Sequence, residues 1–364
     1  MQCTTSEQMT ELSERGSAMD ELNVAGTTPA SGEENPHEEH PADLQMSIEH
    51  PPPSDTSAPE LLTSVLRQFS MNFLLNDISG SQSFGRLVER NCSVRLNVPG
   101  REPRRRSTTI EQVHQSRVSV RRLRSTIRTF TGVLDSNWTL GLLAELSWYA
   151  DILGEVRDLD VLYAAIVRSI WLVEDQRIQA LVLGHLDRQR EEAREHCAQA
   201  QATKRYGALI DEMISFDASV RFVPDAYGPA RRILSTSLNT AWQDVQKARR
   251  SAGQHPTNEN LHRLRIDLKR LQCAFEVVSV IEGKPAERVA RAAESIQQKL
   301  GVVHDESVAA AWLEALVTVE PRLKRPFREL LEFHHGERRE ARRGWKDELR
   351  RVDRSWIRWR EESS

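Results

Sequence analysis

The stretch VHQSRVSVRRLRSTIRTF, residues 113–130, recurs in altered form as LHRLRIDLKRLQCAFEVV, residues 261–278. Both copies fit the pattern His-x-x-Arg-aliphatic-x-aliphatic-Lys/Arg-Arg-Leu, with the histidine at the same place. A second pair of motifs, LGEVRD at 153–158 and LGVVHD at 300–305, follows at nearly the same separation. Because the period is far longer than the roughly 20–50 residues of solenoid repeats, we expect a duplicated helical bundle.

Each copy places its basic side chains on one side of a helix, which we call the basic stripe. At 100° per residue, the stripe of the first copy fills an arc of about 80° over roughly four turns. The apolar positions border it, so we expect the stripe to line a groove between helices. In the second copy Gln272 and Glu276 replace the last two arginines. The stripes consist of His114, Arg117, Arg121, Arg124 and Arg128 in the first copy, and of His262, Arg265 and Lys269 in the second.

Such a stripe needs compensation, because like charges one turn apart destabilise a helix by about 0.2–0.5 kcal/mol per pair. A solvated face with acidic neighbours is one explanation, and it is the usual one for a single arginine-rich helix. Two copies at the same position beside the core favour a bound anion, since a groove concentrates multivalent anions. Arginine suits phosphate because its planar guanidinium can donate two hydrogen bonds at once.

The sequence predicts an all-α fold. No proline occurs between Arg104 and Val223, and no segment has the alternating pattern of a β-strand. We expect helix breaks at Gly154, at Gly301 and near Gly336. The expected helices are 60–77, 109–134, 138–153, 158–172, 174–202, 205–216, 229–251, 258–282, 286–300, 305–317 and 321–361.

Charge is unevenly distributed along the chain. The whole sequence carries 50 Lys and Arg against 53 Asp and Glu, a net charge of −3. Residues 1–60 hold 13 of the acidic residues and only Arg15 on the basic side, so the remainder has a net charge of +9. That positive charge is compatible with a polyanion ligand.

The domain division follows the same change in composition. Seven of the 15 prolines fall at or before Pro59, which predicts a disordered acidic tail over 1–58. The rest, 59–364, is predicted to form a first bundle at 59–216, with an insertion at 79–108, and a second bundle at 217–364.

Composition and motifs exclude several classes of protein. No apolar run is long enough for a transmembrane helix, and the N-terminus lacks the apolar region of a secretory signal. The four cysteines lie far apart without a CxxC pair, so we expect a reducing, cytoplasmic location and no disulfide framework. HExxH, P-loop and GxSxG motifs are missing from the sequence. We therefore predict a non-enzymatic protein with no catalytic residues, no metal site and no cofactor.

Together these motifs resemble the CHAD family, the conserved histidine α-helical domain. The resemblance covers about 109–361 and is carried by 113–130, 153–162, 261–278 and 300–308. It implies two four-helix bundles related by pseudo-two-fold symmetry, with a basic groove between or along them. It also implies binding of inorganic polyphosphate, association with polyphosphate granules and contact with polyphosphate-metabolising enzymes.

By position, the resemblance implies a polyphosphate site made of both stripes and one residue from each LGxx(R/H)D motif. The motif histidines either donate to phosphate or pack within the bundle, and both interpretations stay open. We expect Asp158 and Asp305 to cap the helices that follow them, or to hold a neighbouring arginine. The predicted site consists of His114, Arg117, Arg121, Arg124, Arg128, Arg157, His262, Arg265, Lys269 and His304.

Other basic residues fall outside this set. Arg122 and Arg270 lie away from the stripes, and we expect them in salt bridges or in solvent. A third basic row recurs at four-residue spacing near the C-terminus: Arg338, Arg342, Lys346 and Arg350.

Two further functions remain as alternatives. A groove that binds polyphosphate could also bind the sugar–phosphate backbone of a nucleic acid, although the basic helices lack interleaved aromatic residues. A phosphoanhydride hydrolase could use a motif histidine as nucleophile or base. We predict inorganic polyphosphate as the partner and no association with a membrane.

Overall fold

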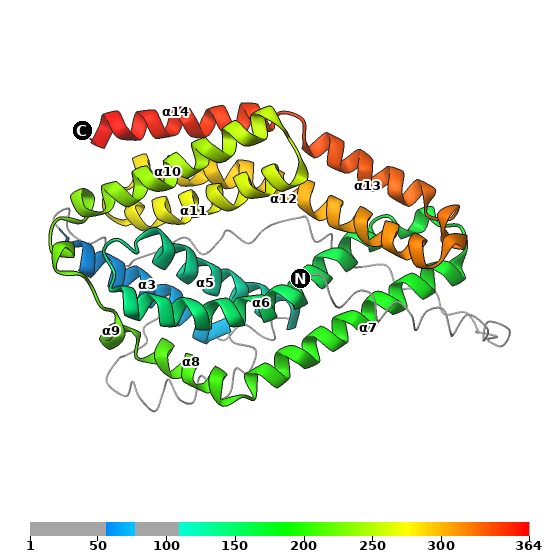
Figure 1. The fold of residues 1–364 in the computed structure, drawn as a ribbon, viewed down its shortest axis with the longest axis horizontal. Helices are drawn as coiled ribbons and strands as arrows, with labels where there is room; N and C mark the ends of the chain where they lie inside the picture. Colours follow the sequence, from blue (N-terminus) through cyan, green and yellow to red (C-terminus); the bar gives the residue numbers. More distant parts are fainter. Residues whose placement is uncertain (1–55, 77–108, 364) are drawn as a thin grey trace.

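The computed structural model describes residues 56–76 and 109–363, and Figure 1 shows their arrangement. The predicted tail up to residue 55 and the predicted insertion lie outside this range. Within it the chain is all α-helical without a β-sheet, which confirms the predicted fold class. The α-helices are α3 (Ala58–Asn76), α5 (Thr109–Thr129), α6 (Ser136–Val167), α7 (Gln176–Gln201), α8 (Lys204–Ile214), α9 (Phe216–Ser219), α10 (Ala230–Gln254), α11 (Asn258–Glu282), α12 (Lys284–Val319), α13 (Arg328–Ala341) and α14 (Trp345–Ser363).

Capping residues set where several helices begin. The Asp135 carboxylate accepts a hydrogen bond from the backbone N–H of Trp138 at 2.9 Å and starts α6. The Thr257 hydroxyl accepts from the N–H of Asn260 at 3.2 Å and starts α11. Each cap satisfies one of the backbone donors that a helix leaves free at its N-terminus, so these starts are encoded locally.

Two of the helix-to-helix connections contain a glycine with a positive φ. Gly283, with φ of 62°, joins α11 to α12, and Gly344, with φ of 73°, joins α13 to α14. Side chains with a Cβ rarely adopt this left-handed region, so glycine is the residue that fits both turns.

The element order repeats along the chain. The first motif copy lies on α5 and α6, and the second lies on α11 and α12. Figure 1 shows α10, α11 and α14 above α3, α5 and α6. Between the two groups, α3 contacts α10, α5 contacts α11 and α6 contacts α12. Equivalent helices of the two copies therefore face each other.

The main hydrophobic core belongs to both groups at once. Buried residues of α3, α5, α6 and α8 form one cluster with those of α10, α11, α12 and α14. A second cluster joins the C-terminal halves of α6 and α12 to the N-terminal half of α7 and to α13. Since one core crosses the position 216/217, the division of 59–364 into two bundles remains a prediction.

Three predicted helix breaks are wrong. The chain runs through Gly154 inside α6 and through Gly301 inside α12, so Asp158 and Asp305 lie within helices and cap nothing. Leu153 and Val156, like Leu300 and Val303, are almost fully buried beside these glycines. Their packing outweighs the cost of about 1 kcal/mol for a glycine inside a helix. The last break falls at Gly344 and not at Gly336, which lies within α13.

Candidate functional site

The contacts of α5 with α11 and of α6 with α12 bring the two motif copies together. Their charged side chains influence one another's ionisation across the four helices. We call this group the basic cluster. It consists of Arg117 and Arg121 from α5, Arg157 from α6, His262, Arg265 and Lys269 from α11, and His304 from α12.

Two aspartates lie within the basic cluster. Arg117 donates a hydrogen bond to Asp158 at 3.1 Å, which confirms that this aspartate holds a neighbouring arginine. In the second copy Asp305 is the carboxylate that acts most strongly on Arg265. Burial raises the pKa of Asp305 above its ordinary value, against the attraction of Arg265. These carboxylates offset part of the positive charge and leave the cluster strongly cationic.

Arg265 packs closely on the facing helix. A Cβ at Gly301 would stand 3.6 Å from its Nε atom, in ordinary van der Waals contact, so the guanidinium lies against the backbone of α12. Burial lowers the pKa of Arg265 below its ordinary value, and Asp305 works in the opposite direction. The side chain is thus held in a partly desolvated position, where its interaction with an anion is strengthened.

The histidines of the second copy lie against each other. The ring centroids of His262 and His304 are 4.6 Å apart, and the rings are inclined by 35°. Burial lowers the pKa of His262, and His304 and Arg265 lower it further. Burial likewise lowers the pKa of His304, with Arg265 as the largest charged contributor. Both rings therefore favour the neutral form at neutral pH when no anion is near.

Lys269 is the most strongly perturbed member of the cluster. Burial holds its pKa well below the usual range, and repulsion from Arg121, Arg265 and Arg117 adds to the effect. Each cation that is desolvated beside another cation raises the free energy of the folded protein when no anion is bound. An anion bound among these side chains would reverse the effect by favouring their charged forms.

Two buried nitrogen atoms of the basic cluster lack a hydrogen-bond partner in the described part of the chain. The Nε atom of Arg265 and the Nδ1 atom of His262 are buried and make no hydrogen bond with any described residue. An unsatisfied buried polar group costs about 1–3 kcal/mol, so such groups in a folded protein point to a missing ligand or water. The cluster therefore has hydrogen-bonding capacity for an oxygen-rich anion.

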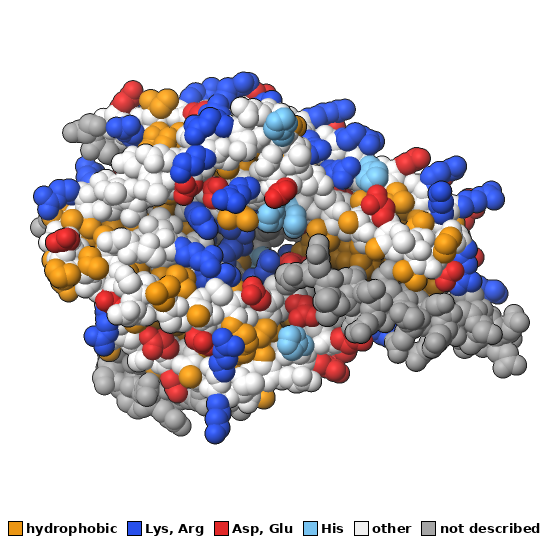
Figure 2. Space-filling model, viewed as in Figure 1, with side chains coloured by type: hydrophobic (Ala, Val, Ile, Leu, Met, Phe, Trp, Pro, Cys, Tyr) orange, Lys and Arg blue, Asp and Glu red, His pale blue; other side chains and the backbone are white. Residues whose placement is uncertain are grey.

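Figure 2 shows how this region looks on the molecular surface. A hollow opens near the middle of the face, between the positions of α11–α12 and α5–α6 in Figure 1. Lys and Arg side chains gather around it, and histidine side chains lie at its edge. A basic hollow of this kind focuses the electric field and attracts anions.

Not every predicted site residue joins the basic cluster. Arg124 and Arg128 share the angle of the first stripe but lie further along α5, where Asp151 is their main acidic neighbour. Arg128 is also close enough to Arg270 to be repelled by it. His114 lies on the first turns of α5, half-buried and in contact with other residues. The stripe thus extends along α5, and only its middle belongs to the basic cluster, whereas Arg128 lies near Arg270 of α11.

The two arginines expected outside the stripes do form salt bridges. Arg122 is buried, lies 3.5 Å from Glu276 and faces the ring of Phe69. Arg270 lies 3.6 Å from Asp267. Both therefore lie in salt bridges, outside the basic cluster.

A buried hydrogen-bonded group was missed by the sequence analysis. The Ser169 hydroxyl lies 3.0 Å from Nε2 of His334, and Nδ1 of His334 lies 2.6 Å from Glu306, which also accepts from Arg168 at 2.6 Å. The order resembles a serine hydrolase triad. However, Ser169 and His334 are 0% exposed, and the hydroxyl faces the carbonyl groups of Ala165 and Ile166. No sequence motif links these positions, and a substrate has no access to the hydroxyl.

The described residues contain neither a metal-binding group nor a membrane-spanning helix. No group of three or more His, Cys, Asp or Glu side chains there is arranged to hold a metal ion. None of the described helices is long and apolar enough to cross a lipid bilayer.

Comparison with known proteins gives a consistent result. Residues 98–314 match the family described as CHAD domain. Two relatives from Mycobacterium tuberculosis, uncharacterized proteins Rv2226 and MT2285, are each 27% identical over 219 residues, or 56% of this chain. The match spans 40% of each relative's length, so most of each relative lies outside it.

Two solved structures share the fold. PptA from Streptomyces chartreusis superposes with a TM-score of 0.57 at 20% identity, covering 83% of this chain and 100% of PptA. The CHAD domain from the plant Ricinus communis superposes with a TM-score of 0.59 at 21% identity, covering 84% of this chain and 94% of that domain.

Proposed function

Because the chain belongs to the CHAD domain family, we propose that it binds inorganic polyphosphate in the basic cluster without catalysing a reaction. Polyphosphate binding is the known property of the family. A polyphosphate chain carries negative charge along its whole length, so it can contact the cations of both motif copies at once. Arg117 and Arg265 would then donate to neighbouring phosphate groups, and Lys269 would add a further positive charge.

One observation carries the proposal: cations of both copies meet where α5 contacts α11 and α6 contacts α12, and two buried nitrogen atoms there have no partner within the described chain. The Nε atom of Arg265 and the Nδ1 atom of His262 have no hydrogen-bond partner among the described residues. A stripe that served only as a solvated surface would keep its donors in water. Partly buried donors beside like charges are instead stabilised when an anion binds.

The test measures polyphosphate binding by the full chain. Arg117→Ala/Arg121→Ala/Arg265→Ala should weaken binding by at least about a hundredfold, since a hydrogen bond to a charged group contributes about 1.5–3 kcal/mol. The matched control is Arg250→Ala/Arg263→Ala/Arg354→Ala, which removes the same charge from exposed positions. Equal affinities of the two variants would refute the site, and no binding by the natural chain would refute the function.

The same preparation separates the alternatives. Single-stranded RNA at matched salt should compete poorly, because the basic cluster offers histidine rings and no larger aromatic platforms for bases. Stronger binding of RNA than of polyphosphate would favour the nucleic-acid alternative. Phosphate release with Mg²⁺ that is abolished by His114→Ala or His262→Ala would favour a hydrolase.

The finer parts of the proposal concern location and partners. A chain that holds polyphosphate through one cluster would concentrate on polyphosphate granules and could meet enzymes that make or degrade the polymer. A fluorescent fusion should therefore co-localise with granules, and the triple variant of the cluster should not.

A further inference from the structure

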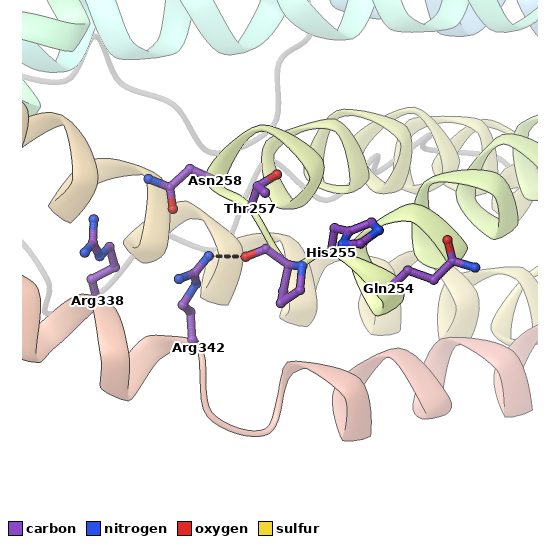
Figure 3. A pocket seen from close by; sticks show the side chains of 7 residues that line it. Gln254, His255, Thr257, Asn258, Arg338 and Arg342 are labelled. Atoms are coloured by element: carbon purple, nitrogen blue, oxygen red, sulfur yellow. Dashed lines mark hydrogen bonds between the residues drawn. The ribbon is translucent and has the colours of Figure 1, made fainter.

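A second basic pocket lies between the α10–α11 turn and α13 (Figure 3). Its volume is about 510 Å³. Arg338 lies on α13 and Arg342 is the residue that caps its C-terminal end; both side chains extend toward the turn and the start of α11. The lining residues are Gln254, His255, Pro256, Thr257, Asn258, Arg338 and Arg342.

The charge of this pocket is not balanced. None of its lining residues is acidic, and no carboxylate among the described residues forms a salt bridge with Arg338 or Arg342. Arg342 donates to the Pro256 carbonyl, and the Nε atoms of both arginines are buried without a hydrogen bond to any described residue. Burial lowers the pKa of Arg342, and Arg338 lowers it further. These features repeat those of the basic cluster.

A neighbouring pocket provides a contrast. It has a volume of about 340 Å³ and is lined by acidic residues as well as basic ones: Asp244, Glu259 and Asp267 beside Lys247, Arg263 and Arg270. Its charges compensate one another, as in an ordinary surface groove. The pocket at Arg338 and Arg342 differs because its positive charge has no acidic counterpart.

The second pocket adjoins the basic cluster along α11. Asn258, which lines the pocket, precedes His262 by one helical turn, and Arg265 and Lys269 continue the same face. At 1.5 Å per residue, the distance along this face from Asn258 to Lys269 is about 16 Å. One extended anion could therefore occupy both places.

We propose that this pocket is a second phosphate subsite, where Arg338 and Arg342 bind a chain that also occupies the basic cluster. The inference rests on the proposed function, because the same polyphosphate molecule joins the two places. Once one end is bound, the other is held near its subsite at high effective concentration, so the affinity for long chains rises. Tripolyphosphate is too short to gain this advantage.

The experiment compares two variants of the full chain with equal loss of charge. Arg338→Ala/Arg342→Ala removes the subsite, and Arg339→Ala/Arg343→Ala removes two exposed arginines of the same segment with the same spacing. Affinity for long-chain polyphosphate should fall at least about tenfold more in the first variant than in the second. Affinity of the basic cluster for tripolyphosphate should be the same in both. The affinity of the first variant for long chains should also depend less on salt. If polyphosphate behaves like a single-stranded nucleic acid, the slope of log K against log salt concentration falls by about 0.7 for each lost phosphate contact.

Each outcome decides between the two proposals. Equal long-chain affinities of the two variants, with binding still lost in Arg117→Ala/Arg121→Ala/Arg265→Ala, would overturn the subsite and leave the proposed function standing. No binding of polyphosphate by the natural chain would overturn both. Because Arg342 contacts the α10–α11 turn, Arg338→Ala alone provides a second test that removes no hydrogen bond of the described residues. It should lower long-chain affinity about threefold or more, and no change would count against the subsite.

Discussion

The rings of His262 and His304 lie with centroids 4.6 Å apart, and the two residues come from different helices of the second motif copy. Burial and nearby cations lower the pKa of each below the ordinary value of 6.5. Protonating either ring places a positive charge beside Arg265, and a bound phosphate would remove that penalty.

The first prediction concerns pH. Since both folded-state pKa values lie below 6.5, the unfolded chain binds more protons just below that pH. The histidine contribution to the stability of the free protein is therefore complete above about pH 6.5 and is lost as pH falls toward the folded-state values. Polyphosphate should reverse this trend, because it favours the protonated rings.

Thermal unfolding and binding titrations between pH 5 and 8 check this prediction. Polyphosphate affinity should rise as pH falls, and His262→Gln/His304→Gln should flatten the profile. A variant with the same pH dependence as the natural chain would assign the effect to other groups.

The second prediction concerns Lys269. Its buried charge lies among Arg121, Arg265 and Arg117, so Lys269→Met should leave the free protein as stable or more stable while weakening polyphosphate binding about tenfold or more. Lys269→Arg, which keeps the charge, is the matched control. Urea unfolding together with titration measures both effects, and a loss of stability without a loss of affinity would contradict the prediction.

The third prediction concerns Glu306. Burial raises the pKa of this carboxyl, but hydrogen bonds from His334 and Arg168 outweigh burial and place the pKa below its ordinary value. Its stabilising contribution is therefore present above the pKa of the unfolded chain and is lost as pH falls through the folded-state pKa. Glu306→Gln should lower the free energy of unfolding by about 3–5 kcal/mol, because Arg168 and the buried His334 lose the negative charge of their carboxylate partner.

The matched control for this third prediction is Glu314→Gln. Glu314 lies on the same helix, is 58% exposed and is 3.6 Å from His335. Its replacement should change stability by less than about 1 kcal/mol. Equal losses of unfolding free energy in the two variants would contradict the prediction, because the buried hydrogen bonds of Glu306 would then contribute no more than an exposed ion pair.

The fourth prediction tests the continuity of α6. A Cβ at Gly154 would have no atom within 4 Å, so Gly154→Ala should stabilise the protein by about 0.5–1 kcal/mol without affecting polyphosphate binding. The matching change, Gly301→Ala, places a methyl group in ordinary van der Waals contact with Arg265 Nε, at 3.6 Å, and should leave polyphosphate binding nearly unchanged. Destabilisation by Gly154→Ala would contradict a helix that runs through this position.

Most of the fold could be predicted from the sequence because helix-forming residues and breakers are local signals. The helix expected at 258–282 has those bounds in the structure, where Thr257 and Gly283 mark its ends. The breaks expected at Gly154 and Gly301 were wrong, because the cost of glycine is local and the packing that outweighs it comes from distant segments.

The site was predictable only in part. Helical periodicity showed which residues share the stripe, but the crossing of α5 and α11 decides which of them meet. Arg121 therefore acts on Lys269 across that crossing, whereas Arg128 lies near Asp151 at the far end. The pocket at Arg338 and Arg342 depends on where α13 lies against the α10–α11 turn. Arg338 and Arg342 were visible in the sequence as a basic row, but Lys346 follows on α14 beyond the Gly344 turn.

Because both motif copies belong to one chain, equivalent positions of the basic cluster can hold different residues. In a symmetric dimer of single repeats, every substitution would appear twice, and equivalent positions would always match. Here Arg157 stands where the other copy has His304, so one side keeps its charge and the other, whose pKa lies below its ordinary value, gains a proton only as the pH falls. A covalent tandem can thus combine one side chain whose attraction for a polyanion is independent of pH with another whose attraction increases as the pH falls. Identical subunits cannot carry two different residues at equivalent positions.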